Sequence, residues 1–398
     1  MQIKVKRKPI NKKKLLRGLY VAALMGIVFG TFACLAFAFL FNGLTDYIEK
    51  STPSVVIQTE VEAKQYISPI TRDSNGGDSV RRELYSMRNM IEKAIVRFDI
   101  AQTESYAVAK GDSKVKTGII FSKSAKIIYI IATPNSIRGK LFVDVTFHDG
   151  TTVEGRVIET DYISGLSVVR VDNVSLSQSL LDSIPNIEFG NSNKMIVGDE
   201  VLAVGNINGM VVSCVVGSIA NVSETFSCID GELSMLGTDI PARDTTNGFI
   251  FNSAGLLCGI ISHSADSVKG EVNLINAIGC SDLTSTIYKL SEGIHFPYMG
   301  ITTRTIDYMT SGIYGIPLGI FVNSVESDSP AFEAGLRVGD IIVAVGEESL
   351  LTGRRLHSFL MGINLDKTAE RTVKLRVLRA IDGAYESRII PIEVSERY

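Results

Sequence analysis

Residues 237–260 hold the side chain best placed to do covalent chemistry. The segment reads GTDIPARDTTNGFIFNSAGLLCGI, so the hydroxyl of Thr246 lies in a polar, turn-rich stretch just before a strand, a turn and a second strand. A hydroxyl becomes a nucleophile only when a positioned base takes its proton and N–H donors wait for the oxyanion. Function therefore depends on whether the rest of the chain supplies that base and those donors.

Histidines and cysteines are scattered along the chain. The four histidines are His148, His263, His295 and His357. We expect His148 and His263 to be solvated or locally hydrogen-bonded, and His357 to lie at a surface or groove edge. The five cysteines are Cys34, Cys214, Cys228, Cys258 and Cys280. They show no CxxC spacing, and we expect buried thiols, although a disulfide is permitted outside the cell. The sequence thus predicts neither a metal nor a cofactor.

An apolar segment near the N-terminus is typical of a membrane helix. Residues 18–41, GLYVAALMGIVFGTFACLAFAFLF, carry no charged side chain, and at about 1.5 Å rise per residue they can cross a hydrocarbon layer of about 30 Å. A cleaved signal peptide is the alternative, but its apolar core should be only about 7–15 residues long. Processing as a lipoprotein at Cys34 fits less well, because Phe32 is bulky. We therefore expect an uncleaved anchor.

The distribution of charge predicts the orientation of this anchor. Residues 1–17 form a basic tail, whereas the first acidic side chain is Asp46, so the positive-inside rule places the N-terminus in the cytoplasm and the bulk of the chain outside. Beyond the tail, 32 Lys and Arg stand against 43 Asp and Glu. An acidic outer part argues against nucleic acid or an anionic lipid surface as its main partner.

The remaining chain divides into a stalk and a strand-rich region. Residues 42–88 are polar and rich in turn signals, and an apolar stripe that includes Met87, Ile91 and Ala94 indicates a short linker helix whose stripe is either core or a self-association surface. Short β-branched runs separated by Gly, Asp and Asn then follow, from about residue 95 to 290. They are AIVRFDI, TGIIF, KIIYIIAT, LFVDVTF, TVEGRVIE, GLSVVRV, EVLAVGN, MVVSCVVGSIANV, GFIF and LLCGIIS. Such runs predict an all-β barrel or sandwich.

The order of several motifs resembles that of HtrA-type serine proteases. HDGTTVEGRVIETD precedes GLSVVRVD, FGNSNKMIVGDEVLAVGNINGMVV precedes GSIANV, and NGFIFNSAGLLCGI follows. The resemblance implies a trypsin-like double β-barrel over residues 89–292. Residues 293–398 resemble the PDZ domain of that family, through PYMGI and SPAFEAGLRVGDIIVAVG. The implied fold is mostly β: a trypsin-like double β-barrel followed by an α+β PDZ domain, with one N-terminal transmembrane helix.

The resemblance also implies that the catalytic groups of the family are missing. Ser136 stands where the base histidine follows a Thr-x-x pattern, Gly165 where the orienting aspartate should be, and Thr246 where the serine of GNSGGP should be. Asp244 takes the place of a glycine whose N–H contributes to the oxyanion hole. Asp161 would need a register shift to act as the orienting carboxylate. Because a serine is no base near neutral pH and a negative charge opposes an oxyanion, we predict an inactive homologue of a serine endopeptidase.

A PDZ domain binds an extended peptide as an added strand, while backbone N–H groups of the preceding loop hold its terminal carboxylate. By resemblance, the pairing strand follows that loop and a helix forms the other wall of the groove. The residues implied to bind peptide are Tyr298, Met299, Gly300, Ile301, Thr302, Leu356, Phe359 and Leu360. The three helix residues fit equally well as plain core.

These observations favour a membrane-anchored, extracytoplasmic HtrA-like protein with a degenerate triad. It would bind peptides or protein C-termini through its PDZ domain as a non-catalytic scaffold or regulator. One alternative is an active, atypical serine- or threonine-type endopeptidase in envelope protein quality control. Another is a structural subunit with a closed PDZ edge, which assembles with active relatives as a mixed oligomer. The assembly expected for the chain is thus either a homo-oligomer or a hetero-oligomer.

Overall fold

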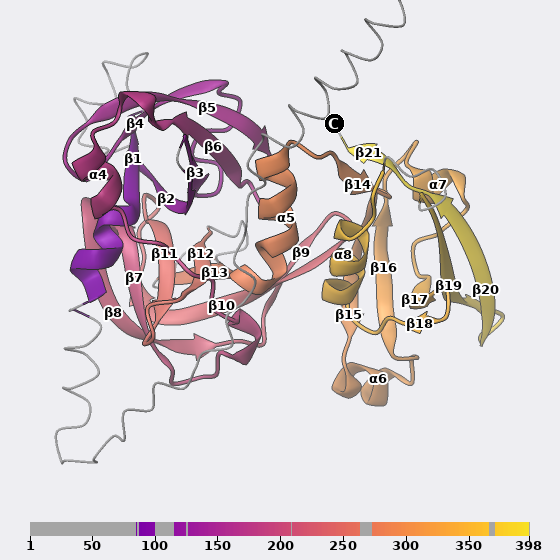
Figure 1. Ribbon diagram of the computed structural model, residues 1–398. Helices are drawn as coiled ribbons and strands as arrows, with labels where there is room; N and C mark the ends of the chain where they lie inside the picture. Colours follow the sequence, from indigo (N-terminus) through magenta and orange to yellow (C-terminus); the bar gives the residue numbers. More distant parts are fainter. Residues whose placement is uncertain are drawn as a thin grey trace, which may run out of the picture. The chain divides into compact units, whose positions relative to one another are not determined.

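The computed structural model describes residues 85–397, apart from residues 86, 100–114, 125, 208, 263–272 and 366–370 (Figure 1). The predicted basic tail, transmembrane helix and most of the stalk therefore lie outside the described residues. Within the described part of the chain, no helix is both long and apolar enough to span a bilayer.

Six antiparallel strands close into a first barrel. They are β1 (Ile95–Asp99), β2 (Lys116–Lys123), β3 (Ile127–Ala132), β4 (Phe142–Thr146), β5 (Thr152–Thr160) and β6 (Ser167–Asp172). The order around the barrel is β1-β2-β3-β6-β5-β4, and pairing of β1 with β4 closes it. β3 is apolar at every position because Ile128 and Ile130 fill the barrel, whereas Tyr129 and Ile131 pack into a second core on the other face.

Seven strands form a second sheet in the order β13-β12-β11-β7-β8-β10-β9, and β13 also pairs with β10. They are β7 (Glu200–Ile207), β8 (Met210–Asn221), β9 (Thr225–Cys228), β10 (Gly231–Pro241), β11 (Asn247–Asn252), β12 (Leu257–Ile261) and β13 (Leu274–Gly279). Gly205 and Gly248 pair between β7 and β11, where a Cβ on Gly248 would collide with the carbonyl oxygen of Val204. Two β units confirm the prediction of a mostly β protein.

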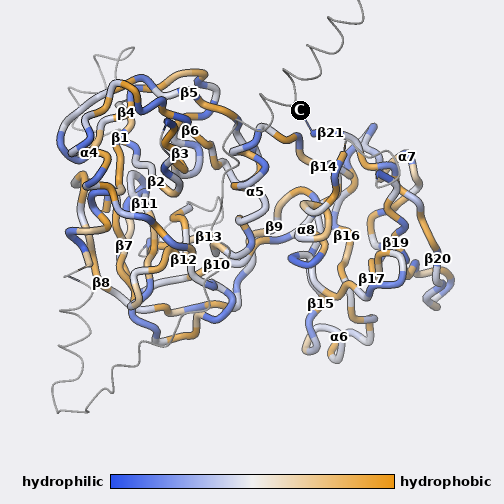
Figure 2. Tube along the Cα trace, in the orientation of Figure 1, coloured by the Kyte–Doolittle hydropathy of each residue, from blue (hydrophilic) through white to orange (hydrophobic). Residues whose placement is uncertain are grey.

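Each predicted run corresponds to a strand, namely β1 to β8, β11 and β12, whereas β9, β10 and β13 are not among the predictions. Figure 2 shows hydrophobic residues along strands such as β7 and more hydrophilic residues in many of the connections. Ile91 and Ala94 are buried in a core shared by residues of both barrels, and Met87 packs against it. Of the two alternatives for this stripe, core is therefore the one that the structure shows for these three residues.

Short helices connect and follow the barrels. They are η1 (Glu92–Ala94), η2 (Asn173–Ser175), α4 (Gln178–Ser183), η3 (Ser192–Lys194) and α5 (Cys280–Glu292). Leu283, Ile287 and Leu290 of α5 lie in the shared core, at the spacing expected for one apolar helix face. α5 ends at Gly293, which adopts the left-handed conformation that closes many helices.

The C-terminal part has its own sheet and core. Its strands are β14 (Phe296–Tyr298), β15 (Ile301–Ile306), β16 (Gly319–Val325), β17 (Ile341–Val345), β18 (Glu348–Ser349), β19 (Thr372–Ile381), β20 (Ala384–Glu393) and β21 (Ser395–Arg397). Its helices are α6 (Tyr308–Tyr314), α7 (Pro330–Glu333) and α8 (Gly353–Met361). The sheet order is β15-β16-β17-β19-β20, so β15 is the strand at one end, preceded by the loop predicted to bind carboxylate. β18 pairs with β17, and β14 pairs with β21.

Candidate functional site

Thr246 ends a tight turn immediately before β11. Its N–H donates to the carbonyl oxygen of Arg243 at 2.9 Å, and its hydroxyl accepts the N–H of Arg243 at 2.9 Å. The side chain is 0% exposed. A nucleophile must present its oxygen to a substrate, whereas this oxygen is enclosed by protein and accepts a hydrogen bond from the backbone.

The same turn also engages the backbone N–H of Thr246. In serine hydrolysis the N–H of the nucleophile residue is one of the oxyanion-hole donors. The N–H of Thr246 instead closes the turn onto Arg243. Asp244 is an exposed residue of this turn, so a carboxylate stands where the resemblance expects a glycine. The N–H and the hydroxyl of Thr246 thus form hydrogen bonds within the turn at residues 243–246.

The other two predicted triad positions lie next to each other, at the facing ends of β3 and β6. The N–H of Asn135 donates to the carbonyl oxygen of Gly165 at 2.8 Å, and Ser136 follows directly. Gly165 has φ +73°, and a Cβ placed on it would lie 2.9 Å from the amide of Asn135. The buried hydroxyl of Ser136 donates to the carbonyl oxygen of Thr133 at 2.6 Å. Neither position offers a proton acceptor for a nucleophile.

Asp161 is the nearest carboxylate in sequence to the missing aspartate, but it has other partners. It accepts hydrogen bonds from the N–H of Ser164 at 3.0 Å and from the Ser164 hydroxyl at 2.6 Å. It also forms an ion pair with Arg397 of β21. Both members of the ion pair are largely buried, so this carboxylate links the first barrel to the end of the chain.

A buried amide beside Thr246 joins the two barrels. The side-chain oxygen of Asn247 accepts from the N–H of Thr117 at 3.0 Å and from its hydroxyl at 2.7 Å, which ties β11 to β2. Its NH₂ group donates to the carbonyl oxygen of Thr245 at 2.9 Å. Asn206 adds a bond to the carbonyl oxygen of Val115 at 3.1 Å. Sequence reasoning missed this pair, although an Asn at the start of an apolar strand is a signal for a buried hydrogen bond.

The predicted carboxylate-binding loop has the expected geometry. The N–H groups of Met299, Gly300 and Ile301 converge on one carboxylate, that of Asp230, at 2.8, 2.9 and 3.0 Å. Gly300 has φ +84°, and a Cβ there would collide with Ser329. Glycine is thus needed for the loop to turn its N–H groups inward. Sequence reasoning did not anticipate Asp230, which lies between β9 and β10.

The other residues implied to bind peptide surround this loop. The hydroxyl of Tyr298 donates to Glu326, and both burial and that carboxylate raise the pKa of Tyr298 above its ordinary value. Thr302 is the second residue of β15, and its hydroxyl lies 2.6 Å from that of Ser324 on the neighbouring strand β16. On α8, Leu356 and Leu360 are buried in the core of this part and Phe359 packs against it.

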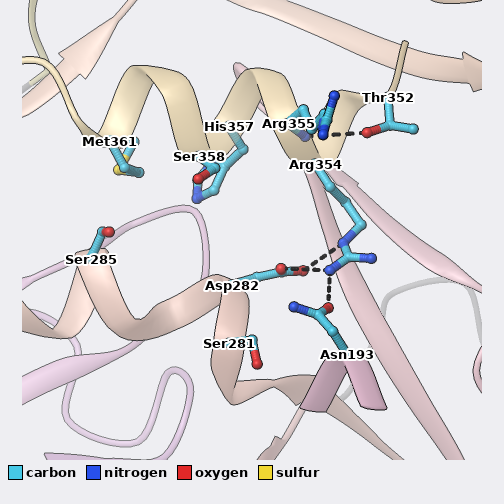
Figure 3. A pocket seen from close by; sticks show the side chains of 10 residues that line it. All are labelled: Asn193, Ser281, Asp282, Ser285, Thr352, Arg354, Arg355, His357, Ser358 and Met361. Atoms are coloured by element: carbon cyan, nitrogen blue, oxygen red, sulfur yellow. Dashed lines mark hydrogen bonds and ion pairs between the residues drawn. The ribbon is translucent and has the colours of Figure 1, made fainter. Parts of the chain in front are cut away.

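A pocket of about 390 Å³ lies between α5 and α8 (Figure 3). Arg354 of α8 reaches Asp282 of α5 through two hydrogen bonds of 2.9 and 2.8 Å, and it also bonds Asn193. Asp282 accepts in addition from the N–H of Ser234 on β10, at 2.6 Å. Asp282 therefore holds α5, α8 and β10 together.

His357 also lines this pocket, and of its two expected places, a surface or a groove edge, the surface is wrong. The residue is 4% exposed, and neither ring nitrogen has a hydrogen-bond partner among the described residues. Burial lowers its pKa, so the ring is neutral near pH 7. α8 packs on the core with one side and on β10 with another. The contact with β10 covers His357, which the apolar stripe of the helix alone would place at the surface.

The chain is similar to known proteins in its domains, its sequence and its fold. A trypsin-like peptidase domain model matches residues 117–260, and a PDZ domain model matches residues 297–388. The serine protease Do-like HtrA of Bacillus subtilis is 27% identical over 66% of the chain, and the alignment covers 60% of that relative's length. The Do-like HtrB of the same organism is 23% identical over 88% of the chain and 78% of its own length.

The chain belongs to the HtrA-type family. A solved structure described as the HtrA-type protease AlgW with decapeptide agrees in fold, with a TM-score of 0.55 at 18% identity over 79% of this chain and 99% of that one. In the HtrA-type chain, Ser136, Gly165 and Thr246 all fall within the trypsin-like match, whereas the loop that includes Gly300 falls within the PDZ match. Asp230 belongs to the trypsin-like match, so the PDZ loop binds a carboxylate from the other part of the molecule.

Proposed function

We propose that this HtrA-type chain is a non-catalytic homologue that binds peptides or protein C-termini through its PDZ domain. Residues 18–41 would anchor it in the cell membrane, with the basic tail in the cytoplasm and the folded part outside. The observation that carries the loss of catalysis is the enclosed Thr246, whose N–H and hydroxyl both bond to the backbone of Arg243.

The size of the catalytic deficit supports this proposal. Loss of a single oxyanion donor costs about 3–4 kcal/mol in hydrolases, and loss of the base alone removes most of the rate that the triad supplies. In this chain Ser136 replaces the base, Gly165 replaces the orienting group, and the turn at residues 243–246 consumes a donor. These losses do not add, because the groups act as one unit, but any one of them is sufficient.

The geometry of the PDZ loop supports a carboxylate ligand. Three N–H groups on consecutive residues meet at one point, which is the arrangement of an anion-binding nest. Solved HtrA-type relatives are described with a decapeptide and with a tripeptide. A peptide that ends in a free carboxylate is the corresponding ligand class for this chain.

The test of the first half is a protease assay on the purified full-length chain with unfolded casein. We expect no cleavage above buffer and no labelling by a fluorophosphonate probe, since only an activated hydroxyl reacts. Thr246→Ala is the matched control, because it removes the hydroxyl in question. Cleavage or labelling that disappears in Thr246→Ala would instead establish an active, atypical endopeptidase.

A second candidate function is favoured by one observation. The N–H groups of the PDZ loop are already bonded to Asp230, as expected for a structural subunit with a closed edge. Binding of free-acid peptides to the full-length chain separates the two candidates. A scaffold that recognises C-termini binds them under some condition, whereas a permanently closed subunit binds none.

A further inference from the structure

The tip of the β9–β10 hairpin enters the PDZ loop as a peptide terminus would. The carboxylate of Asp230 accepts the three N–H groups of Met299, Gly300 and Ile301 within 3.0 Å. In return, the N–H of Asp230 donates to the carbonyl oxygen of Ile301 at 2.7 Å. A bound peptide terminus offers this same pair of groups, a carboxylate for the loop and an N–H for the first residue of the strand.

The hairpin continues along β15 in the manner of an added strand. Ile229 forms an antiparallel bridge with Thr302. The hydroxyl of Ser227 on β9 donates to the carbonyl oxygen of Thr303 at 2.9 Å. Each contact uses an edge group of β15 that an extended peptide requires, so hairpin and peptide cannot pair with β15 together.

The returning strand β10 fills the space toward α8. Glu232 accepts from the N–H of Thr305 at 2.7 Å and from its hydroxyl at 2.6 Å. Gly231 lies so near α8 that a Cβ on it would be 2.5 Å from the Cβ of His357. A Cβ on Gly353 would in turn be 2.7 Å from Cγ of Glu232. The hairpin thus contacts both walls of the predicted groove, the strand and the helix.

Asp230 is buried in the loop in an unusual backbone conformation. The residue is 1% exposed, and burial of a carboxylate is strongly unfavourable unless charge-assisted hydrogen bonds replace its water. Asp230 also adopts φ +65°, a conformation that few residues other than Gly, Asn and Asp accept. The loop supplies three donors at one point, which makes it an anion site, and Asp230 is the anion that occupies it.

We propose that the β9–β10 hairpin is an internal ligand of the PDZ domain, and that a peptide with a free C-terminal carboxylate binds only after displacing Asp230 from the loop. The inference rests on the proposed peptide-binding function, which it supplements with a mechanism of control. If the hairpin occupies the groove about 99% of the time, the apparent Kd of a peptide rises about 100-fold above that of the open groove.

The first experiment compares the full-length protein with Asp230→Asn. Asparagine keeps the shape and tolerates the left-handed conformation, but it replaces one of the two acceptor oxygens with an NH₂ group, a donor that faces the N–H groups of the loop. The matched control is Asp382→Asn, since Asp382 is an exposed residue with φ +49° in the turn between β19 and β20. The probes are fluorescent hexapeptides ending in each of the twenty amino acids, as free acids and as C-terminal amides.

We expect Asp230→Asn to bind the preferred free acids about tenfold or more tightly than the native protein does, with no gain for the amides. Asp382→Asn should match the native protein. A disulfide between Ile229→Cys and Thr302→Cys, made in a Cys228→Ser background, should abolish binding when oxidised and restore it when reduced. Native protein or oxidised variant that binds free acids as tightly as Asp230→Asn would overturn the inference.

Hydrogen exchange at the amides of Met299, Gly300 and Ile301 separates this inference from the proposed function. We expect exchange there to be at least about tenfold faster in Asp230→Asn than in the native protein and in Asp382→Asn. Equal exchange in all three proteins would overturn the internal-ligand inference. Faster exchange with no binding of any hexapeptide would uphold the internal ligand and refute peptide binding as the function.

Discussion

Two polar residues show how burial decides what a side chain can do. Thr246 has a hydroxyl at the position that suggests catalysis, but burial and bonds to Arg243 make it part of a turn. Asp230 has no catalytic appearance in the sequence, yet three backbone donors hold its carboxylate in a buried site. Chemical type alone predicts neither role, because each depends on the hydrogen-bond partners that the fold supplies.

The pKa of Asp230 gives a prediction about pH. Burial is the main cause that raises this pKa from 3.8 to about 6, and the three N–H donors and Arg397 oppose it. Tyr298 in the loop and Cys228 on β9 are the other titratable groups that interact with Asp230. Because the docked state binds the proton more tightly, docking is most stable below pH 3.8, loses stability as the pH rises to about 6, and is constant above that.

The total loss over this interval is on the order of 3 kcal/mol. The measurement is hydrogen exchange at Gly300 and Ile301 as a function of pH, corrected for intrinsic exchange and compared with Asp230→Asn. We expect the difference between the two proteins to change across this interval and to level off above pH 6. A difference that does not depend on pH would contradict the assignment.

Asn247 gives a second prediction at the same scale. Asn247→Ala leaves the buried N–H and hydroxyl of Thr117 without their acceptor, so we expect a loss of about 1–3 kcal/mol in the free energy of unfolding. Asn323→Ala, at an exposed position of β16, should change stability by less than about 0.5 kcal/mol. Urea denaturation of the full-length variants measures both. Equal effects would mean that the amide does not join the barrels.

At the scale of elements, the strands of a trypsin-like fold position the three predicted triad residues. β3 and β6 bring Ser136 and Gly165 together as the resemblance implies, and β11 begins directly after Thr246. The connections have changed: Asn135 fills the space beside Gly165, and residues 243–246 form a closed turn. Strand pairing is thus independent of the loops that carry chemistry.

Restoring the triad residues alone should therefore fail. We expect the triple variant Ser136→His, Gly165→Asp, Thr246→Ser to leave casein intact, because a Cβ at residue 165 meets the Asn135 amide at 2.9 Å and the turn still consumes an oxyanion donor. Circular dichroism should confirm that the variant folds before the assay is interpreted. Cleavage by this variant would show that the turn rearranges readily.

The sequence predicts the strands well where they are apolar. Residues 127–132 are buried on both faces and residues 152–160 include five β-branched side chains, and both runs are found as strands. The β9–β10 hairpin was missed because Thr225–Cys228 is short and mixed in polarity. Asp230-Gly231 is a strong hairpin signal, but a turn signal carries no information about where the tip docks. That position is set by α8 and β15, more than 70 residues away.

At the scale of the whole molecule, buried charges connect the HtrA-type parts. Asp161 of the first barrel pairs with Arg397 of β21, and Arg397 also lies over the ring of Phe296 at 5.1 Å. Asp282 and Arg354 form a second connection between α5 and α8. Only the first pair is almost fully buried, so it should matter more for stability.

We expect Asp161→Asn to lower the free energy of unfolding by about 3–5 kcal/mol, because it leaves the guanidinium of Arg397 buried without a counter-charge. Combining it with Arg397→Leu should recover part of this loss. Arg354→Ala, which breaks the more exposed pair, should cost less. Urea denaturation gives all three values, and a change below about 1 kcal/mol for Asp161→Asn would contradict the role of this pair.

Because Asp230 belongs to the same polypeptide as the loop it occupies, its competition with peptides should not depend on the concentration of the protein. A tethered competitor has a fixed effective concentration, which for short connections is in the millimolar range and is insensitive to how much protein the cell makes. Raising the abundance of the chain cannot relieve the blockade, and diluting it cannot either. Only the supply of rival termini sets the fraction that is engaged, so the molecule would report the amount of such termini around it.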